Sequence, residues 1–353
     1  MKLIKPKILF ISPCTPDIKG TGWQQRSFSF LNAYLNFMDV DLWYTPTNNE
    51  NPSEATKKLI ATCASVVTFK KGTLNYLKDA AFRMRVQQAD FIHTFRTFIG
   101  FEHKAILWDF DELPRQLVKK SSQNLEERIY VPEIYLQMRK RSKIAYSSSF
   151  IEKDPSLGKV FEIPNVYDIH IISQRNPDKN TLLFVGNMDF QPNIEAIYWF
   201  TKEVLPILSK SIKLRVVGRS PQSMETKNRL LQLAIHNNLE FIFDVADCNP
   251  YYETALVALA PIFSGGGTKV KILEAFANYC PVISTSKGVE GLHVTHENEV
   301  IIANTKNEFE EAILKVNTIS KLLSDKAYQY LVKQHSQHIV QERILNIISQ
   351  EII

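Results

Sequence analysis

The chain has 353 residues, of which 44% are hydrophobic and 22% charged, and its formal net charge at pH 7 is +5. This composition is typical of a folded protein with enough residues for two cores, and it excludes a disordered or fibrous chain. The modest positive charge suits an anionic small molecule or an anionic lipid surface, but it falls short of a dedicated nucleic-acid-binding protein. We therefore expect no nucleic-acid partner.

The cysteines and the first residues indicate the compartment. The sequence predicts neither a disulfide framework nor a zinc site, because its cysteines stand singly, at Cys14, Cys63, Cys248 and Cys280. The start, MKLIKPKILFISP, is too interrupted by charge and proline for a signal peptide. Apolar stretches fall short of the roughly 18 residues that a membrane span requires. The expected location is the cytoplasm, with any contact to the inner face of the membrane peripheral.

Short apolar runs alternate with amphipathic stretches through the first half of the chain. Residues 7–12 are predicted to form a buried strand, and residues 24–37 have helical spacing. Further strands are predicted for the runs VDLWY, SVVTF, DFIHTF, AILWDF and IAYSSS, with helices over 74–88 and 125–141. Because this alternation favours a parallel sheet covered on both faces, we predict a Rossmann-like domain here.

A polar segment that contains prolines, PNVYDIHIISQRNPDKN, separates the two halves. We predict domains over residues 1–172 and 173–353. The second half repeats the alternation, with strands LLFVGN, LRVVG, FIF, ALVALA and PVIST and helices over 192–208 and 224–237. The fold class is therefore predicted to be α/β, with two Rossmann-like domains. The last stretch, 328–353, is long enough to form a helix that crosses back over a neighbouring domain.

Three consecutive glycines precede a predicted helix in the stretch PIFSGGGTKVKILEAFA. The strand ALVALA leads Gly265, Gly266 and Gly267 to the carboxyl edge of the sheet, where open α/β sheets bind their ligands. Glycines let the backbone approach a ligand closely. A helix that begins near Thr268 would direct its free N–H groups at the same place.

Two lysines, Lys269 and Lys271, fall in the first turn expected for that helix. A cation there opposes the helix macrodipole at a cost of about 0.3–1 kcal/mol each. A bound phosphate would explain both, and Glu274 on nearly the same face would accept hydrogen bonds from a sugar hydroxyl such as a ribose. A nucleoside diphosphate carries both groups. The alternative is an ordinary glycine turn before a helix with solvated lysines, since one glycine-rich loop is a weak signal.

A resemblance to the retaining GT-B glycosyltransferases of family 4, in particular the bacterial surface-polysaccharide members, covers most of the second half. It is carried by the stretches LLFVGNMDFQPNIEAIYWFTKEVLP, LRVVGRSP and PYYETALVALAPIFSGGGTKVKILEAFANYCPVISTSKGVEGL. The resemblance implies two Rossmann-like domains that face each other across a cleft. The N-terminal domain would be the acceptor side, and the C-terminal domain would bind a nucleotide-sugar donor.

Two departures from the family's pattern affect the implied donor site. Glu274 matches the ribose-binding second glutamate of the family's E-x7-E element, but Gly266 replaces the first glutamate. The family's usual Arg and Lys pair is also missing, since the chain reads GNMDFQPN there. The resemblance therefore implies that Lys271 supplies the charge, with Arg219 as a helper. The implied donor-binding residues are Gly186, Asn187, Arg219, Val245, Gly265, Gly266, Gly267, Thr268, Lys271 and Glu274.

The first domain resembles the family more weakly. Gly20 and Gly22 lie where the family has a flexible glycine loop, and His93 matches a histidine at the acceptor side. The resemblance implies catalytic roles for Lys271, Glu274 and His93, although a lone histidine between apolar residues is also typical of a core. The stretch GTGWQQ is close to the dinucleotide fingerprint, but its third glycine is a glutamine, so NAD binding is disfavoured.

Other charged residues in the first domain have ordinary interpretations as well. Asp109 and Asp111 could ligate a divalent metal, but they lie away from the implied diphosphate, and a solvated or capping role is favoured. Lys78, Arg83 and Arg85, with the run QMRKRSK, could meet anionic lipid headgroups or could be solvated helix faces. We expect no metal and leave contact with an anionic membrane open.

The expected activity is transfer of a sugar from a UDP- or GDP-sugar to a glycan or lipid-linked acceptor. The resemblance implies retention of configuration, no cofactor, and a place in cell-surface polysaccharide biosynthesis. Two alternatives stay open: a nucleotide-sugar epimerase on the same fold, and a non-catalytic subunit that binds a sugar nucleotide. The missing glutamate and the missing cation pair are what keep the second alternative open.

Overall fold

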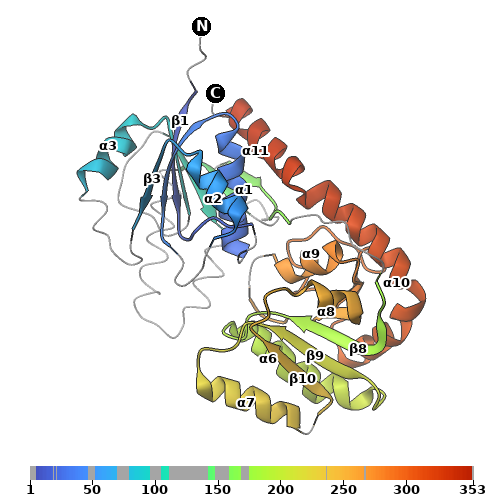
Figure 1. Ribbon diagram of the computed structural model, residues 1–353. Coiled ribbons are helices and arrows are strands. Elements are labelled where there is room, and N and C mark those ends of the chain that lie inside the picture. Colours follow the sequence, from blue (N-terminus) through green and yellow to red (C-terminus); the bar gives the residue numbers. More distant parts are fainter. Residues whose placement is uncertain are drawn as a thin grey trace. The chain divides into compact units, whose positions relative to one another are not determined.

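The computed structural model describes residues 5–18, 20, 22–46, 52–69, 79–95, 105–110, 142–147, 159–167, 175–235, 237–265 and 268–351. The chain divides into two compact units. The first unit consists of Met1–Val166 together with His335–Ile353, and the second consists of Tyr167–Gln334. Each unit is built on a sheet of its own (Figure 1).

The sheet of the first unit has seven strands within the described residues, and every pairing between them is parallel. In spatial order the strands are β3 (Ser65–Thr68), β2 (Asp39–Tyr44), β1 (Lys7–Ser12), β4 (Phe91–Phe95), β5 (Ile106–Phe110), β6 (Ser142–Ser147) and β7 (Val160–Glu162). The strand order reverses between β1 and β4, which is the switch point of a doubly wound fold. The helices described in this unit are α1 (Gly22–Leu35), α2 (Glu54–Ala61), α3 (Ala80–Gln88) and α11 (Gln337–Glu351).

The sheet of the second unit has six described strands, also all parallel. Its spatial order is β10 (Leu239–Phe243), β9 (Lys213–Gly218), β8 (Asp178–Val185), β11 (Ala255–Ala260), β12 (Val282–Ser284) and β13 (Ile301–Ile302). The switch point lies between β8 and β11. The helices are α6 (Gln191–Trp199), α7 (Met224–Ile235), α8 (Asn249–Thr254), α9 (Val270–Ala277) and α10 (Lys306–His335).

The central strands explain why the sheets are parallel. All six residues of β11 are buried, as are the last five residues of β8. A strand that is apolar along its whole length must be covered on both faces, and helices that return the chain after each strand provide that cover. The predicted α/β class with two Rossmann-like domains is confirmed.

Helix α6 ends less regularly than the predicted helix over 192–208. It continues as a π-helical turn, Phe200–Val204, and then as a 3-10 turn, Leu205–Ile207. Pro206 lies in that last turn, and proline has no N–H with which to continue an α-helical ladder. The run that was predicted as a single helix is therefore helical throughout but changes its hydrogen bonding near its end.

The last helix, α11, belongs to the first unit. Its residues Val340, Ile344 and Ile348 are buried in that unit's core, and α11 packs beside α1 (Figure 1). The predicted crossing of the C-terminal helix is thus observed. It changes the predicted limits, because residues 335–353 leave the second domain and the division falls after Val166 rather than after residue 172. The apolar face of α11 is the physical reason.

Candidate functional site

The residues predicted to bind a nucleotide follow the carboxyl ends of neighbouring strands in the second unit. Gly186 and Asn187 follow β8, Arg219 follows β9, Val245 follows shortly after β10, and the glycine-rich stretch follows β11. Since these strands are parallel neighbours, their ends share one edge of the sheet. The edge includes the β8/β11 switch point, where doubly wound folds bind ligands.

The loop after β11 is fixed against the start of α6. Ser264 Oγ donates a hydrogen bond to Glu195 Oε2 over 2.8 Å. Gly265 has φ +92°, a backbone conformation that favours glycine, and a Cβ there would lie 3.2 Å from Pro192 Cγ. Gly266 and Gly267 lie outside the described residues. The sequence predicts that Gly265 lets the backbone approach a ligand, and the described contact that favours a glycine here is the approach of Pro192 on α6.

Helix α9 begins two residues later than the sequence suggested. Its N-cap is Lys269, without a side-chain capping bond, and the first helical residue is Val270. Lys269 therefore precedes the first turn, and its side chain is buried. The prediction of two lysines within the first turn is corrected to one, Lys271, which still opposes the macrodipole. Thr268 is half-buried just before the cap.

Lys271 projects from α9 toward the ends of β8 and α6. Its Nζ donates a hydrogen bond to Asn193 Oδ1 over 2.7 Å and lies 3.9 Å from the centroid of the Phe184 ring. Gly186 leaves room for this arrangement, because a Cβ there would lie 3.1 Å from Nζ and 2.8 Å from Asn193 Nδ2. Burial, followed by the like charge of Lys269, lowers the pKa of Lys271 to about 7.

Glu274 lies three residues after Lys271, so both side chains occupy one face of α9. The Tyr252 hydroxyl, from α8, donates to Glu274 Oε2 over 3.0 Å and also lies 3.3 Å from the carbonyl oxygen of Lys271. Burial raises the pKa of Glu274 to about 7, against the lowering effects of the Tyr252 hydrogen bond and of Lys271. Near neutral pH the site thus holds a base and an acid that are each poised to change charge.

The other predicted donor-site residues lie at the same sheet edge with different exposure. Asn187 is exposed, and its carbonyl oxygen accepts a hydrogen bond from Asn193 Nδ2 over 2.8 Å. Arg219 is exposed, and its carbonyl oxygen accepts from the Met188 amide over 3.1 Å. Val245 is half-buried and packs against the core of this unit. Gly186 and Asn187 lie beside Asn193, which contacts Lys271, whereas Arg219 and Val245 follow the more distant strands β9 and β10.

Three residues of this site were not singled out from the sequence. Asn193 ends the GNMDFQPN stretch, Phe184 belongs to the predicted strand LLFVGN, and Tyr252 lies in the stretch PYYETALVALAP that carries the resemblance. The Pro-Asn pair at the start of α6, at the carboxyl edge of the sheet, was the one available signal for Asn193. The individual contacts of Phe184 with Lys271 and of Tyr252 with Glu274 could not be read from the sequence, since they depend on the packing of β8 and α8 against α9.

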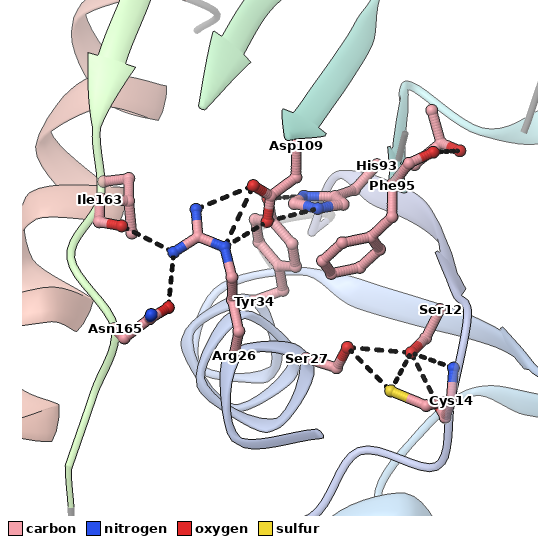
Figure 2. A network of polar contacts seen from close by, with 11 residues as sticks. Ser12, Cys14, Arg26, Ser27, Tyr34, His93, Phe95, Asp109, Ile163 and Asn165 are labelled. Atoms are coloured by element: carbon pink, nitrogen blue, oxygen red, sulfur yellow. Dashed lines mark hydrogen bonds and ion pairs between the residues drawn. The ribbon is translucent and has the colours of Figure 1, made fainter. Parts of the chain in front are cut away.

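His93 lies in the core of the first unit, with its side chain fully buried on β4 (Figure 2). Its ring is surrounded by Phe30, Phe10 and Phe95 at centroid distances of 4.6, 4.9 and 5.0 Å. Its Nδ1 is hydrogen-bonded to the Tyr34 hydroxyl over 2.7 Å. Burial, followed by the charge of Arg26, holds the pKa of His93 well below its usual value. This placement favours a core histidine over the predicted catalytic one, because aromatic side chains occupy the space a substrate would need.

Asp109, one of the two residues considered as metal ligands, forms an ion pair with Arg26 inside the first unit (Figure 2). Arg26 Nε donates to Asp109 Oδ2 and Nη2 to Oδ1, both over 2.8 Å. Arg26 Nη1 also donates to the Ile163 carbonyl oxygen over 2.7 Å. This buried bidentate pair explains Asp109 without a metal. Asp111 lies outside the described residues.

The remaining predicted residues of the first unit are only partly described. Gly22 is the first residue of α1, and the Gly20 amide donates to the Asp17 carbonyl oxygen over 3.2 Å. Arg85 Nε donates to Ser65 Oγ over 3.0 Å, while Lys78 and residues 137–141 of the basic run fall outside the description. Among the helices that the structure describes, none combines the length and apolar character of a membrane-spanning segment. Across the same described residues, no cluster of three His, Cys, Asp or Glu side chains is arranged to hold a metal ion.

Solved structures resemble both units taken together. HepE from Anabaena, solved with UDP and glucose, covers 98% of this chain and all of its own at 13% identity, with a TM-score of 0.65. Sucrose-phosphate synthase from Thermosynechococcus elongatus matches over 98% of this chain and 99% of its own at 16% identity, with a TM-score of 0.68. WaaG, described as a glycosyltransferase involved in lipopolysaccharide biosynthesis, matches over 97% of this chain and 99% of its own at 14% identity, with a TM-score of 0.67. At these identities the likeness establishes the fold, which is that of the GT-B glycosyltransferases.

Sequence comparison adds a family for the second unit. Residues 179–318 match the model of the family described as "Glycosyl transferases group 1". A curated relative, an uncharacterized 44.6 kDa protein in the cps region of Klebsiella pneumoniae, is 29% identical over 139 residues. That match spans 38% of this chain and 36% of the relative. The family match falls on the unit that holds Lys271 and Glu274, and it supports the prediction of a transferase that uses a nucleotide sugar.

Proposed function

We propose that this protein is a glycosyltransferase that takes a sugar from a nucleoside-diphosphate sugar bound at the edge of the second sheet. The observation that carries the proposal is the pair Lys271 and Glu274, side by side on the first turns of α9. The pair lies in the unit that matches the group 1 glycosyltransferase family. UDP and GDP are the candidate nucleotides, and HepE, which shares the fold, was solved with UDP.

The roles follow from the chemistry of the side chains. Lys271, the free N–H groups at the start of α9 and the backbone of the glycine-rich stretch would bind the diphosphate. Glu274, held by Tyr252, would accept a hydrogen bond from a ribose hydroxyl. When the sugar leaves, negative charge develops on the diphosphate, and a preorganised cation with helix amides stabilises that charge. Leaving-group stabilisation is therefore the main catalytic contribution of this unit.

The finer assignment concerns the reaction's outcome and its acceptor. We propose family 4 membership and transfer with retention of configuration and without a metal, on the resemblance of the second-half motifs. A glycan or lipid-linked acceptor in cell-surface polysaccharide biosynthesis is supported by the shared fold of WaaG, a protein of lipopolysaccharide biosynthesis. The first unit, with Gly20 and Gly22, would bind that acceptor in the cytoplasm, with any membrane contact peripheral. His93 is no longer part of the proposed catalytic set.

A transfer assay with the full chain tests the proposal. Purified protein would be incubated with UDP- and GDP-sugars, with and without a membrane extract as acceptor source, and products would be separated by mass and by the NMR coupling of the anomeric proton. We expect a glycosylated product of retained configuration that depends on both Lys271 and Glu274. Lys271→Ala and Glu274→Ala should abolish it while the circular dichroism spectrum stays unchanged.

Three outcomes would contradict the assignment. An epimerised sugar formed without acceptor indicates the epimerase. Tight binding of UDP or GDP without turnover for any sugar indicates a non-catalytic subunit. A product whose formation is unaffected by Lys271→Ala places the chemistry elsewhere in the molecule.

A further inference from the structure

The ammonium group of Lys271 is held by an uncharged acceptor. Its Nζ contacts Asn193 Oδ1 at 2.7 Å and the Phe184 ring at 3.9 Å. Among the described residues, no carboxylate forms an ion pair with Nζ. A lysine that is partly removed from water usually pairs with a carboxylate, because an unpaired buried charge is unfavourable. Within the part of the chain that the structure describes, the direct partners of Nζ are therefore uncharged, and Glu274 on the same helix face acts on the ammonium without an ion pair.

Asn193 is itself fixed from the other side. Its Nδ2 donates to the carbonyl oxygen of Asn187 over 2.8 Å, so its Oδ1 must face Lys271. The side chain is buried near the start of α6. An amide oxygen can accept a hydrogen bond from a neutral amine as well as from an ammonium. Asn193 therefore positions Lys271 in either protonation state, whereas an aspartate would favour the charged state.

Other charged groups around Lys271 come from a small number of elements. At the N-cap of α9, Lys269 disfavours the charged form, and on α9 itself Glu274 favours it. From β8 and α6 the neighbours are Phe184 and Asn193, which carry no charge. From α8, the Tyr252 hydroxyl contacts the Lys271 carbonyl oxygen and Glu274 Oε2 rather than Nζ. Asp247, just before α8, acts on Glu274 and not on Lys271.

We propose that Asn193 is a positioning residue for Lys271, and that binding of a nucleoside diphosphate at this site is coupled to the uptake of one proton by the Lys271 amine. The inference rests on the proposed function. In the empty site the lowered pKa, about 7, leaves the amine mostly neutral at pH 8. A diphosphate beside Nζ supplies the missing negative charge and favours the ammonium. The proton comes from solvent, and the affinity falls about tenfold per pH unit above neutrality.

Isothermal titration calorimetry with UDP and with GDP measures the coupling directly. Titrations of the full chain at pH 8, in two buffers of different ionisation enthalpy, give the number of protons taken up per nucleotide bound. The terminal phosphate is fully ionised at this pH, so it contributes no proton. We expect a net uptake of protons that approaches one per nucleotide, because burial lowers the pKa of the free Lys271 amine and leaves it largely neutral at this pH.

Variants test which residue takes up the proton and whether Asn193 positions Lys271. Lys271→Met should remove the uptake and weaken binding. Asn193→Asp places a carboxylate against Nζ and keeps the amine charged, so nucleotide should bind with no uptake and with little dependence on pH between 7 and 8. Asn237→Asp is the matched control, because the Asn237 side chain donates to the Leu233 carbonyl oxygen on α7 and not to Lys271, and it should keep the wild-type uptake. Glu274→Gln should also keep it.

The outcomes separate this inference from the donor site itself. Nucleotide binding at pH 8 without proton exchange overturns the coupling and leaves the donor site standing. Uptake that disappears in Glu274→Gln but persists in Lys271→Met assigns the proton to Glu274 and overturns the role of Lys271. If neither UDP nor GDP binds at any pH from 6 to 8, the donor site and the coupling both fail. If Asn193→Asp does not fold, the comparison of wild type with Lys271→Met decides.

Discussion

Tyr252 donates its hydroxyl proton to Glu274 Oε2 over 3.0 Å, which joins α8 to the predicted ribose-binding carboxylate on α9. The Tyr252 side chain is almost fully buried, so its hydroxyl has little access to water as an alternative partner. A buried hydroxyl of this kind orients the carboxylate and stabilises its charged form. The position of Glu274 is therefore set by a residue from another helix as well as by its own.

The first prediction concerns this hydrogen bond. Tyr252→Phe should raise the pKa of Glu274 further, because the hydrogen bond lowers it at present. More of the carboxyl would then be protonated at pH 7, and UDP or GDP affinity should fall about fivefold, the equivalent of about 1 kcal/mol for one hydrogen bond. Tyr251→Phe, at the neighbouring position, is the control. Equal calorimetric affinities for the two variants would show that Tyr252 does not act through Glu274.

The second prediction concerns the space beside Lys271. Gly186→Ala places a methyl group 3.1 Å from Nζ and 2.8 Å from Asn193 Nδ2, which must displace one or both side chains. Both are side-chain atoms that can move, so the second unit should still fold, with a change in melting temperature of a few degrees. Nucleotide affinity should fall by at least tenfold. Wild-type affinity in Gly186→Ala would mean that the observed position of Lys271 is not the binding position.

The sequence predicted the sheets and one face of α9 because those features depend on local pattern. Uniformly apolar runs such as ALVALA require cover on both faces, and a spacing of three places Lys271 beside Glu274 whatever the rest of the chain does. The exact start of α9 was harder to predict from the sequence. The helix starts at Val270, and nothing local distinguishes that start from one at Thr268.

Partners that lie far apart in the sequence were not predictable from one chain. Asn193 is 78 residues from Lys271, and Arg26 is 83 residues from Asp109. Asp109 was weighed as a metal ligand because a carboxylate at a strand end has no visible partner until the fold brings α1 against β5. The catalytic role of His93 was implied by the family resemblance alone. The phenylalanines that enclose its ring come from β1, α1 and β4, so this environment depends on the fold.

The third prediction tests the buried pair in the first unit. Asp109→Asn removes the negative charge and leaves the Arg26 guanidinium buried without compensation, so the variant should lose about 3–5 kcal/mol of unfolding free energy. Urea unfolding followed by a probe in the first unit measures the loss, and UDP binding by the second unit should persist at low temperature. If Asp109→Asn instead keeps its stability and loses a metal-dependent activity, the metal interpretation of Asp109 is right.

The fourth prediction is a pH dependence that follows from His93. Its pKa is held well below the usual value of about 6.5 in the folded state, so the unfolded chain binds a proton that the folded chain does not as the pH falls through 6.5. The stability that His93 contributes is therefore present above pH 6.5 and decreases below it, by up to about 1.4 kcal/mol per pH unit until the folded-state pKa is reached.

His93→Gln, which can still accept from Tyr34, should be less stable at pH 8 yet lose less stability on acidification to pH 5. Unfolding curves at the two pH values measure the difference, and nucleotide binding at pH 8 should be unaffected. A variant that loses as much stability as wild type between pH 8 and pH 5 would show that His93 is not the buried neutral group, and loss of sugar transfer with full stability would return it to the catalytic set.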